Sequence, residues 1–382
     1  MIKACLNHYP LPISLIRSNP LKFTSITQCL SFLILTCSFT SVHAVDNPFT
    51  VDLKTGENGF FLQEDPFYSD KLKETVQYKL DYTRWQPSSQ KDNGHVIIYN
   101  HGLQSHRAWF NATAEKLKLL GYTVYAFDRI GSGTSSDAYA LDGWYMGMEE
   151  WLPFLPFVDV VQRRGHIRDY DQFLTSIDKM KKIALNENPN KKIHLWGNSY
   201  GAKIVTNYLL DSERSHNISS SIFTTPGLYR NKEKMPLPFS RVSLFLSKSA
   251  DQFESPVVPI DNNKGAHWFT SMPIWLDRIT NDPLSLRTMT RKMGFQTLAM
   301  DKNIAAHEGK NLDFSKSKRF YLMVNDDVMM DNEKMQQHIA NNQGNNQVKF
   351  YQGGKENKHF LAFTADADTA INDIDQFLLQ SK

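Results

Sequence analysis

The chain has 382 residues, 41% of them hydrophobic, with 43 Lys and Arg against 40 Asp and Glu. All three cysteines, Cys5, Cys29 and Cys37, lie in the first 44 residues, so the sequence after them can form neither a disulfide nor a cysteine metal site. These figures argue against a disulfide-stapled scaffold, a zinc finger and a polybasic nucleic-acid binder, and they favour a globular body with a large core.

The first 44 residues have the pattern of an export signal. Basic residues are followed by an apolar run, Cys29–Phe39, and by Val42-His43-Ala44, which ends in a small residue. The run is too short to supply the roughly 20 residues that span a bilayer. We therefore predict a signal peptide over residues 1–44 and an exported domain, periplasmic or secreted, over residues 45–382. A lipoprotein acylated at Cys37 and an uncleaved membrane anchor stay open as alternatives.

Strand-like and helix-like segments alternate along the rest of the chain. Apolar or alternating runs predict strands at residues 76–85, 95–100, 122–128, 192–196, 219–224, 319–324 and 347–352. Intervening segments predict helices at residues 114–121, 170–185, 200–210, 333–340 and 367–379. This alternation is typical of an α/β fold with a doubly wound, mostly parallel sheet that is covered by helices on both faces.

Two segments interrupt the alternation, at about residues 137–163 and 229–295. The first carries aromatic side chains, among them Trp144 and Trp151, and the second is rich in proline before a helix expected at Asp282–Met293. Insertions in such sheets usually lie above the carboxyl ends of the strands. We predict that both form a lid or cap. Its aromatic residues are expected to line an acyl-chain tunnel, to touch a membrane, or to pack the lid onto the domain.

The strongest local pattern is Gly197-Asn198-Ser199-Tyr200-Gly201, which follows an apolar strand and precedes a predicted helix. G-x-S-x-G in that setting is typical of a nucleophile elbow, a tight turn in which the glycines leave the space that side chains would fill. We therefore predict that Ser199 is a catalytic nucleophile.

A serine nucleophile needs a base to remove its proton, and the base needs a carboxylate to orient it. Asp327, after the strand at 319–324, is the predicted acid, with Asp326 and Asp331 as alternatives. His359, after the next strand, is the predicted base. The carboxyl ends of parallel strands meet at one edge of a sheet, so these side chains can converge despite their distance in the sequence.

The tetrahedral intermediate of acyl transfer needs two backbone N–H donors around its oxyanion. Tyr200, directly after the nucleophile, is one predicted donor, and Leu103 in the loop His101-Gly102-Leu103 is the other. His101 precedes the oxyanion glycine, where a structural role is favoured over a catalytic one. The sequence contains no metal cluster, dinucleotide fingerprint or phosphate loop, so we expect no cofactor.

Together these motifs resemble the α/β-hydrolase superfamily, in the branch of monoglyceride lipases, lysophospholipases and serine aminopeptidases. The similarity runs from about residue 95 to the C-terminus and includes, besides the elbow, the segments and residues Asn100-His101-Gly102, DRIGSGTS at 128–135, Arg164-Gly165-His166, Asp327 and His359. The resemblance implies a Ser-His-Asp hydrolase with a cap, and it does not fix the substrate. The aromatic insertion at 137–163 departs from the family pattern.

The expected activity is hydrolysis of a carboxylic ester in a lipid-like substrate, such as a monoacylglycerol or a lysophospholipid. We expect a small-molecule or lipid partner, with peripheral membrane contact as an option, and no nucleic acid. A proline-type aminopeptidase is one alternative, for which Glu149, Glu150, Asp251 and Glu254 are available to hold a substrate ammonium. The other is an inactive hydrolase fold that serves as a binding module, against which the intact Ser, Asp and His set argues.

Overall fold

The computed structural model describes residues 56–141, 160–231, 255–256, 266–310, 317–342, 344–353 and 358–380. All of them belong to one compact unit, Asn47–Lys382, and the other unit, Met1–Asp46, lies outside the described residues together with the predicted signal peptide. The aromatic part of the first insertion, residues 142–159, also lies outside them. In the described ranges, no helix has the length and apolar character that a membrane crossing requires.

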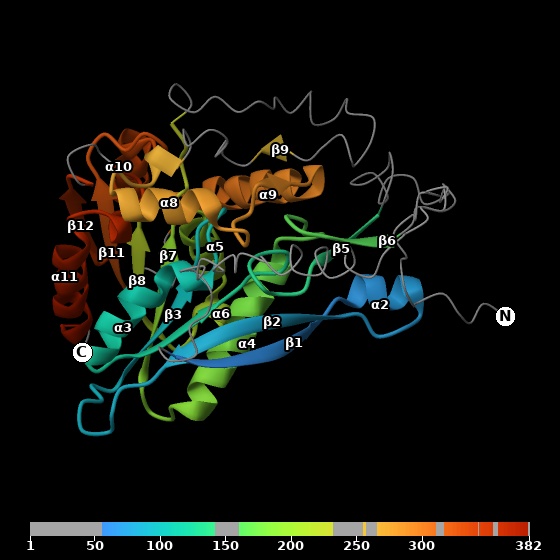
Figure 1. Ribbon diagram of the computed structural model, residues 1–382, viewed down its shortest axis with the longest axis horizontal. Coiled ribbons are helices and arrows are strands. Elements are labelled where there is room, and N and C mark those ends of the chain that lie inside the picture. The colour runs from blue at the N-terminus through green and yellow to red at the C-terminus, as the bar shows by residue number, and fades with distance from the viewer. Residues whose placement is uncertain are drawn as a thin grey trace, which may run out of the picture. The chain divides into compact units, whose positions relative to one another are not determined.

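The central sheet has eight strands in the order β1-β2-β4-β3-β7-β8-β11-β12 (Figure 1). The six strands from β4 to β12 in this order are parallel to one another, whereas β2 runs antiparallel to both β1 and β4. The strands are β1 (Glu57–Glu64), β2 (Gln77–Trp85), β3 (His95–Asn100), β4 (Thr123–Phe127), β7 (Lys192–Asn198), β8 (Ile218–Thr224), β11 (Lys318–Val324) and β12 (Asn346–Tyr351). The predicted doubly wound, mostly parallel sheet is confirmed, and β1 is an addition to it.

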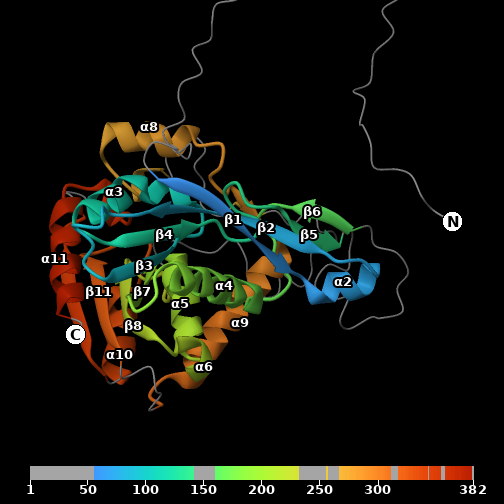
Figure 2. The ribbon, with the colours of Figure 1, turned by 90° about the horizontal axis from the view of Figure 1, so that it is seen from below.

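Helices cover both faces of this sheet (Figure 2). The helices that the argument uses are α3 (Asn111–Leu119), α4 (Asp171–Glu187), α5 (Tyr200–Leu209), α8 (Pro273–Asn281), α9 (Arg291–His307), α10 (Asn332–Asn341) and α11 (Ala367–Leu379). In β3, Val96 and Ile98 pack in the core that includes α4 and α5, whereas Ile97 and Tyr99 pack in the core that includes α3 and α11. Successive strand residues point to opposite faces, so a fully apolar strand is buried between two helical layers.

The helix predicted at Asp282–Met293 is wrong. Helix α8 ends at Asn281 and α9 begins at Arg291, with a turn and the short strand Thr288–Met289 between them. Asp282 precedes a proline, which disfavours the helical conformation at that residue, and its φ and ψ are −70° and 109°. Thr290 is the N-cap of α9, and its side chain accepts a hydrogen bond from the Met293 N–H.

The two insertions are described only in part. The ends of the first form an antiparallel pair, β5 (Ala138–Leu141) with β6 (Val160–Arg163). The described part of the second contains a short pair of strands, β9 (Ser255–Pro256) with β10 (Thr288–Met289), and the helix α8. The proposed boundaries of the lid and its role stay predictions.

Candidate active site

Ser199 occupies the sharp turn between β7 and α5. Its φ and ψ are 50° and −115°, a conformation that non-glycine residues seldom adopt. A Cβ atom on Gly201 would lie only 2.0 Å from the Asn100 carbonyl oxygen, and one on Gly197 would lie 2.5 Å from the Ala202 Cα. Both glycines of the G-x-S-x-G pattern are therefore required by close backbone approach, and the turn between them is strained.

The end of β8 holds the backbone of this turn. The Ser199 N–H donates to the Thr224 carbonyl at 3.0 Å, and the Ser199 carbonyl accepts from the Gly227 N–H at 2.8 Å. A Cβ on Gly227 would lie 2.7 Å from the Ser199 carbonyl carbon. The end of β8 and the residues after it therefore hold the strained backbone of Ser199 through hydrogen bonds on both sides of its side chain.

The structure brings Ser199, His359 and Asp327 together in one hydrogen-bonded chain. His359 Nε2 lies 2.8 Å from Ser199 Oγ, and His359 Nδ1 lies 2.7 Å from Asp327 Oδ2. A carboxylate only accepts, so Nδ1 carries the proton and Nε2 is free to accept from the serine hydroxyl. The other oxygen of Asp327 accepts from the N–H groups of Met329, at 2.7 Å, and Met330, at 3.3 Å.

The two alternative acids lie elsewhere. Asp326 has an exposed side chain and a φ of 50°, at the turn that follows β11. Asp331 is the N-cap of α10, where its side chain accepts from the Lys334 N–H at 3.0 Å and pairs with the Lys334 ammonium. Among the three candidates, only Asp327 reaches the imidazole of His359 in the described structure.

An apolar shell surrounds His359, which is fully buried. The second insertion contributes to it, because the His359 N–H donates to the Trp268 carbonyl at 2.9 Å and the Phe360 N–H donates to the Phe269 carbonyl at 3.0 Å. The Phe269 ring also lies edge-on to the imidazole, with the ring centroids 6.2 Å apart. His359 therefore lies in apolar surroundings, where charge interactions are stronger than in water.

The loop after β3 approaches the predicted nucleophile, Ser199, at Gly102. A Cβ on Gly102 would lie 3.5 Å from the Ser199 Cβ, which places the predicted donor Leu103 one residue from this contact. His101 is fully buried, and its Nδ1 donates to the Gly102 carbonyl at 2.8 Å while its Nε2 accepts from the Arg129 N–H at 3.3 Å. Burial and the neighbouring Arg129 cation hold the pKa of His101 well below its ordinary value. His101 therefore stays neutral and shapes the loop.

Comparison with known proteins agrees with this geometry. A family model described as "Serine aminopeptidase, S33" matches residues 91–355. The chain belongs to this family of α/β hydrolases. The resemblance found in the sequence motifs is thereby confirmed.

Individual relatives of this S33 hydrolase are distant. A monoacylglycerol lipase of Mycolicibacterium smegmatis is 23% identical over 184 residues, which cover 48% of this chain and 53% of that protein, so the match spans only about half of the relative. A soluble variant of monoglyceride lipase from Saccharomyces cerevisiae, solved with a substrate analog, has a TM-score of 0.63 at 18% identity and covers 85% of this chain and 95% of its own. The monoacylglycerol lipase of Paleococcus ferrophilus has a TM-score of 0.57 at 17% identity, covering 79% and 99%. At these identities the structures show the fold alone.

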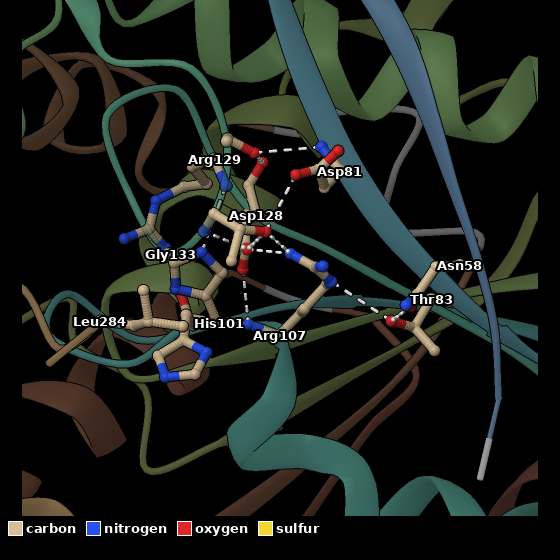
Figure 3. Close-up of polar contacts among 12 residues, drawn as sticks. Asn58, Asp81, Thr83, His101, Arg107, Asp128, Arg129, Gly133 and Leu284 are labelled. Atoms are coloured by element: carbon tan, nitrogen blue, oxygen red, sulfur yellow. Dashed lines mark hydrogen bonds and ion pairs between the residues drawn. The ribbon is translucent and has the colours of Figure 1, made fainter. Parts of the chain in front are cut away.

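The DRIGSGTS loop of this S33 hydrolase is organised around the buried Asp128 (Figure 3). Its carboxylate accepts from the Arg107 N–H at 2.7 Å, from the Arg107 guanidinium, and from the Thr134 N–H at 2.9 Å. A Cβ on Gly133 would lie 2.2 Å from that carboxylate, which explains the second glycine of the motif. Burial is the largest influence on the pKa of Asp128 and acts to raise it, but Arg107, the neighbouring histidines and the Arg107 N–H together outweigh burial, and the pKa is lowered.

A segment of the second insertion, residues 282–286, is bonded directly to the loop that carries the predicted oxyanion donor. We call this segment the strap. Asp282 accepts from His106 Nε2 at 2.9 Å and from Trp109 Nε1 at 2.7 Å, and the Leu286 N–H donates to the Gln104 carbonyl at 2.9 Å. Burial is the largest influence on the pKa of Asp282 and acts to raise it, but the interactions with His106, Trp109 and the Leu284 N–H together outweigh burial, and the pKa is lowered.

Sequence patterns gave no indication of the strap contacts or of the buried arginines around Asp128. The contacting residues are far apart in the sequence and belong to no recognisable motif. His106 and Asp282, for example, lie 176 residues apart. In the described part of the chain, no group of three or more histidine, cysteine, aspartate or glutamate side chains is placed to hold a metal ion.

Proposed function

We propose that the protein hydrolyses carboxylic esters of lipid-like substrates, such as monoacylglycerols or lysophospholipids, through an acyl-enzyme on Ser199. The observation that carries this proposal is the chain of hydrogen bonds from Ser199 Oγ through His359 to Asp327. The names of the relatives support the substrate class, because a curated relative and two structural neighbours are monoacylglycerol or monoglyceride lipases.

In this mechanism His359 Nε2 takes the proton of Ser199 as the oxygen attacks the ester carbonyl carbon. The negative charge that develops on the carbonyl oxygen faces the backbone N–H groups of Leu103 and Tyr200. His359 then donates the proton to the leaving alcohol. Asp327 stays ionised throughout, orients the imidazole and stabilises its positive form.

The second half of the reaction repeats these steps with water. His359 Nε2 removes a proton from a water molecule that attacks the acyl-enzyme, and it returns the proton to Ser199 Oγ as the carboxylic acid leaves. Trp109, Phe269 and Phe360 pack together beside His359 and hold its surroundings apolar during both halves of the reaction.

The decisive experiment combines a covalent probe with an isosteric variant. A fluorophosphonate should label the wild-type protein at Ser199, and Ser199→Ala should lose both the label and p-nitrophenyl ester turnover while keeping its melting temperature. Turnover retained by Ser199→Ala would refute the nucleophile assignment. A series of p-nitrophenyl esters of increasing chain length tests the lipid-like substrate class, and a preference for the shortest acyl group contradicts it.

The aminopeptidase alternative is tested in the same assay. The four acidic residues that would hold a substrate ammonium, Glu149, Glu150, Asp251 and Glu254, all lie outside the described residues. Aminoacyl p-nitroanilides should therefore be tested beside the esters. Faster turnover of a prolyl anilide than of any ester would replace the ester proposal with the peptidase one.

A further inference from the structure

Arg129 is a buried arginine whose hydrogen bonds all point to one loop. Its side chain is 1% exposed, and its guanidinium donates to the carbonyls of three consecutive residues. These are His101, Gly102 at 3.0 Å and Leu103 at 3.4 Å. The Arg129 N–H also donates to His101 Nε2 at 3.3 Å. One residue therefore bonds three consecutive carbonyls at the start of the loop that carries the predicted oxyanion donor.

No carboxylate in the described structure pairs with this guanidinium. Asp128, its neighbour in the sequence, accepts hydrogen bonds from Arg107 and Thr134 instead, as the dashed contacts in Figure 3 show. Burial of a cation without a counter-ion is costly unless other groups stabilise the charge. Burial lowers the pKa of Arg129 to about 10, so the guanidinium remains charged at neutral pH.

Two aromatic rings stabilise the charge in place of a carboxylate. The guanidinium carbon lies 5.3 Å from the centroid of the Tyr200 ring and 5.6 Å from that of Phe173, both within the range of a cation–π interaction. Tyr200 is the residue whose backbone N–H is the second predicted oxyanion donor. Arg129 thus contacts the residues that carry both donors.

Peptide planarity turns these carbonyl contacts into control of an N–H group. The Gly102 carbonyl and the Leu103 N–H belong to the same planar trans peptide, so they point in opposite directions. When Arg129 and His101 hold the Gly102 carbonyl from one side, the Leu103 N–H must face the other side. Gly102 itself lies against Ser199.

We infer that Arg129 is the positioning residue of the oxyanion hole, because it fixes the peptide that presents the Leu103 N–H and packs on the side chain of Tyr200. This inference rests on the proposed function, since it concerns the same reaction at Ser199. The role needs a planar group with several donors. A lysine has its three donors on a single nitrogen, whereas Arg129 reaches His101 from one terminal nitrogen and Gly102 and Leu103 from the other, a spread that a lysine does not match.

The test compares Arg129→Met and Arg129→Lys with Arg319→Met. Arg319 is an equally buried arginine near the start of β11, at the end of the sheet opposite the carboxyl ends where Ser199 and His359 lie, so it controls for the general cost of removing a buried cation. In the full chain, both Arg129 variants should lower kcat for p-nitrophenyl butyrate about 100-fold, with KM changed less than about threefold, as when a transition-state contact is lost. The Arg319 variant should keep kcat.

A second measurement separates positioning from general loosening of the fold. A trifluoromethyl ketone forms an oxyanion-bearing adduct with the serine, so its affinity should fall by the same factor as kcat in the Arg129 variants. Amide hydrogen exchange should accelerate in the peptide containing residues 101–104 and not in β11 or β12. If Arg129→Met does not fold, Arg129→Lys carries both measurements.

The outcomes distinguish the two proposals. If the wild-type protein neither turns over esters nor labels at Ser199, the proposed function fails. If the wild type is active and either Arg129 variant keeps kcat and inhibitor affinity within about threefold of it, the inference about Arg129 is overturned and the function stands. Equal losses in the Arg129 and Arg319 variants also overturn it, since they indicate destabilisation only.

Discussion

Replacing Asp327 with asparagine should reverse the tautomer of His359. One oxygen of Asp327 accepts from the backbone N–H groups of Met329 and Met330, and the other accepts from His359 Nδ1. An asparagine has one acceptor and one donor end. If its NH₂ group faced the Met329 N–H across 2.7 Å, two donors would oppose each other, at a cost of about 1–3 kcal/mol.

The amide oxygen of the variant therefore turns to the backbone, and the NH₂ group turns to His359 Nδ1. Because that nitrogen must then accept, the proton moves to Nε2, which lies 2.8 Å from Ser199 Oγ and can no longer remove its proton. The expected loss is about 10,000-fold in kcat, or about 5.5 kcal/mol of transition-state stabilisation. The melting temperature should change little, because the two side chains have the same shape.

Steady-state turnover of p-nitrophenyl butyrate measures the effect, and Asp326→Asn is the matched control. The Asp326 side chain is exposed, and asparagine readily adopts its positive φ, so this variant should keep its rate. A loss of less than tenfold in Asp327→Asn would refute the tautomer argument. A larger loss in Asp326→Asn than in Asp327→Asn would reassign the acid.

Two further predictions concern stability. Gly201→Ala places a methyl carbon 2.0 Å from the Asn100 carbonyl oxygen, so it should destabilise the fold by about 3 kcal/mol or more and abolish turnover. Thermal unfolding measures this against Gly309→Ala, where an added Cβ has open space but the φ of 72° should cost about 1 kcal/mol, and equal melting temperatures contradict the prediction. Burial lowers the pKa of His194 to about 3. As the pH falls below about 6.5, only the unfolded chain takes up a proton at this histidine, so the free energy of unfolding decreases. Between pH 6.5 and 5 the free energy of unfolding of His194→Gln should therefore fall by about 2 kcal/mol less than that of the wild type. Exposed His216→Gln should not, and indistinguishable pH profiles for the two variants would count against the assignment.

The parallel strands were predictable because burial on both faces leaves a local trace. In β3, β7 and β11 nearly every residue is apolar or buried, and a short run of this kind between turn residues has few other interpretations. Strand β1 leaves no such trace, because it is an edge strand in which Phe60 and Leu62 are exposed. The helix expected at Asp282–Met293 failed because a proline and a capping threonine divide it.

The candidate site divides in the same way. Ser199 belongs to a motif whose glycines are explained by local backbone contacts, and His359 and Asp327 follow from strand order. Arg129 stands inside a motif, yet nothing in its spacing shows that its guanidinium bonds a loop 26 to 28 residues away. Such contacts arise from the packing of distant segments, and a single sequence carries no record of them.

The strap has a consequence for protein engineering. One way to change the substrate preference of such an enzyme is to replace its predicted cap with that of a relative and to leave the core unchanged. Here such a graft would remove the partner of His106 and Trp109 and the N–H that bonds the Gln104 carbonyl, all within the loop that follows Gly102. The unit that can be exchanged is therefore not the whole insertion: a chimera must retain Asp282 to Leu286 from the recipient and place its second junction before Asp282.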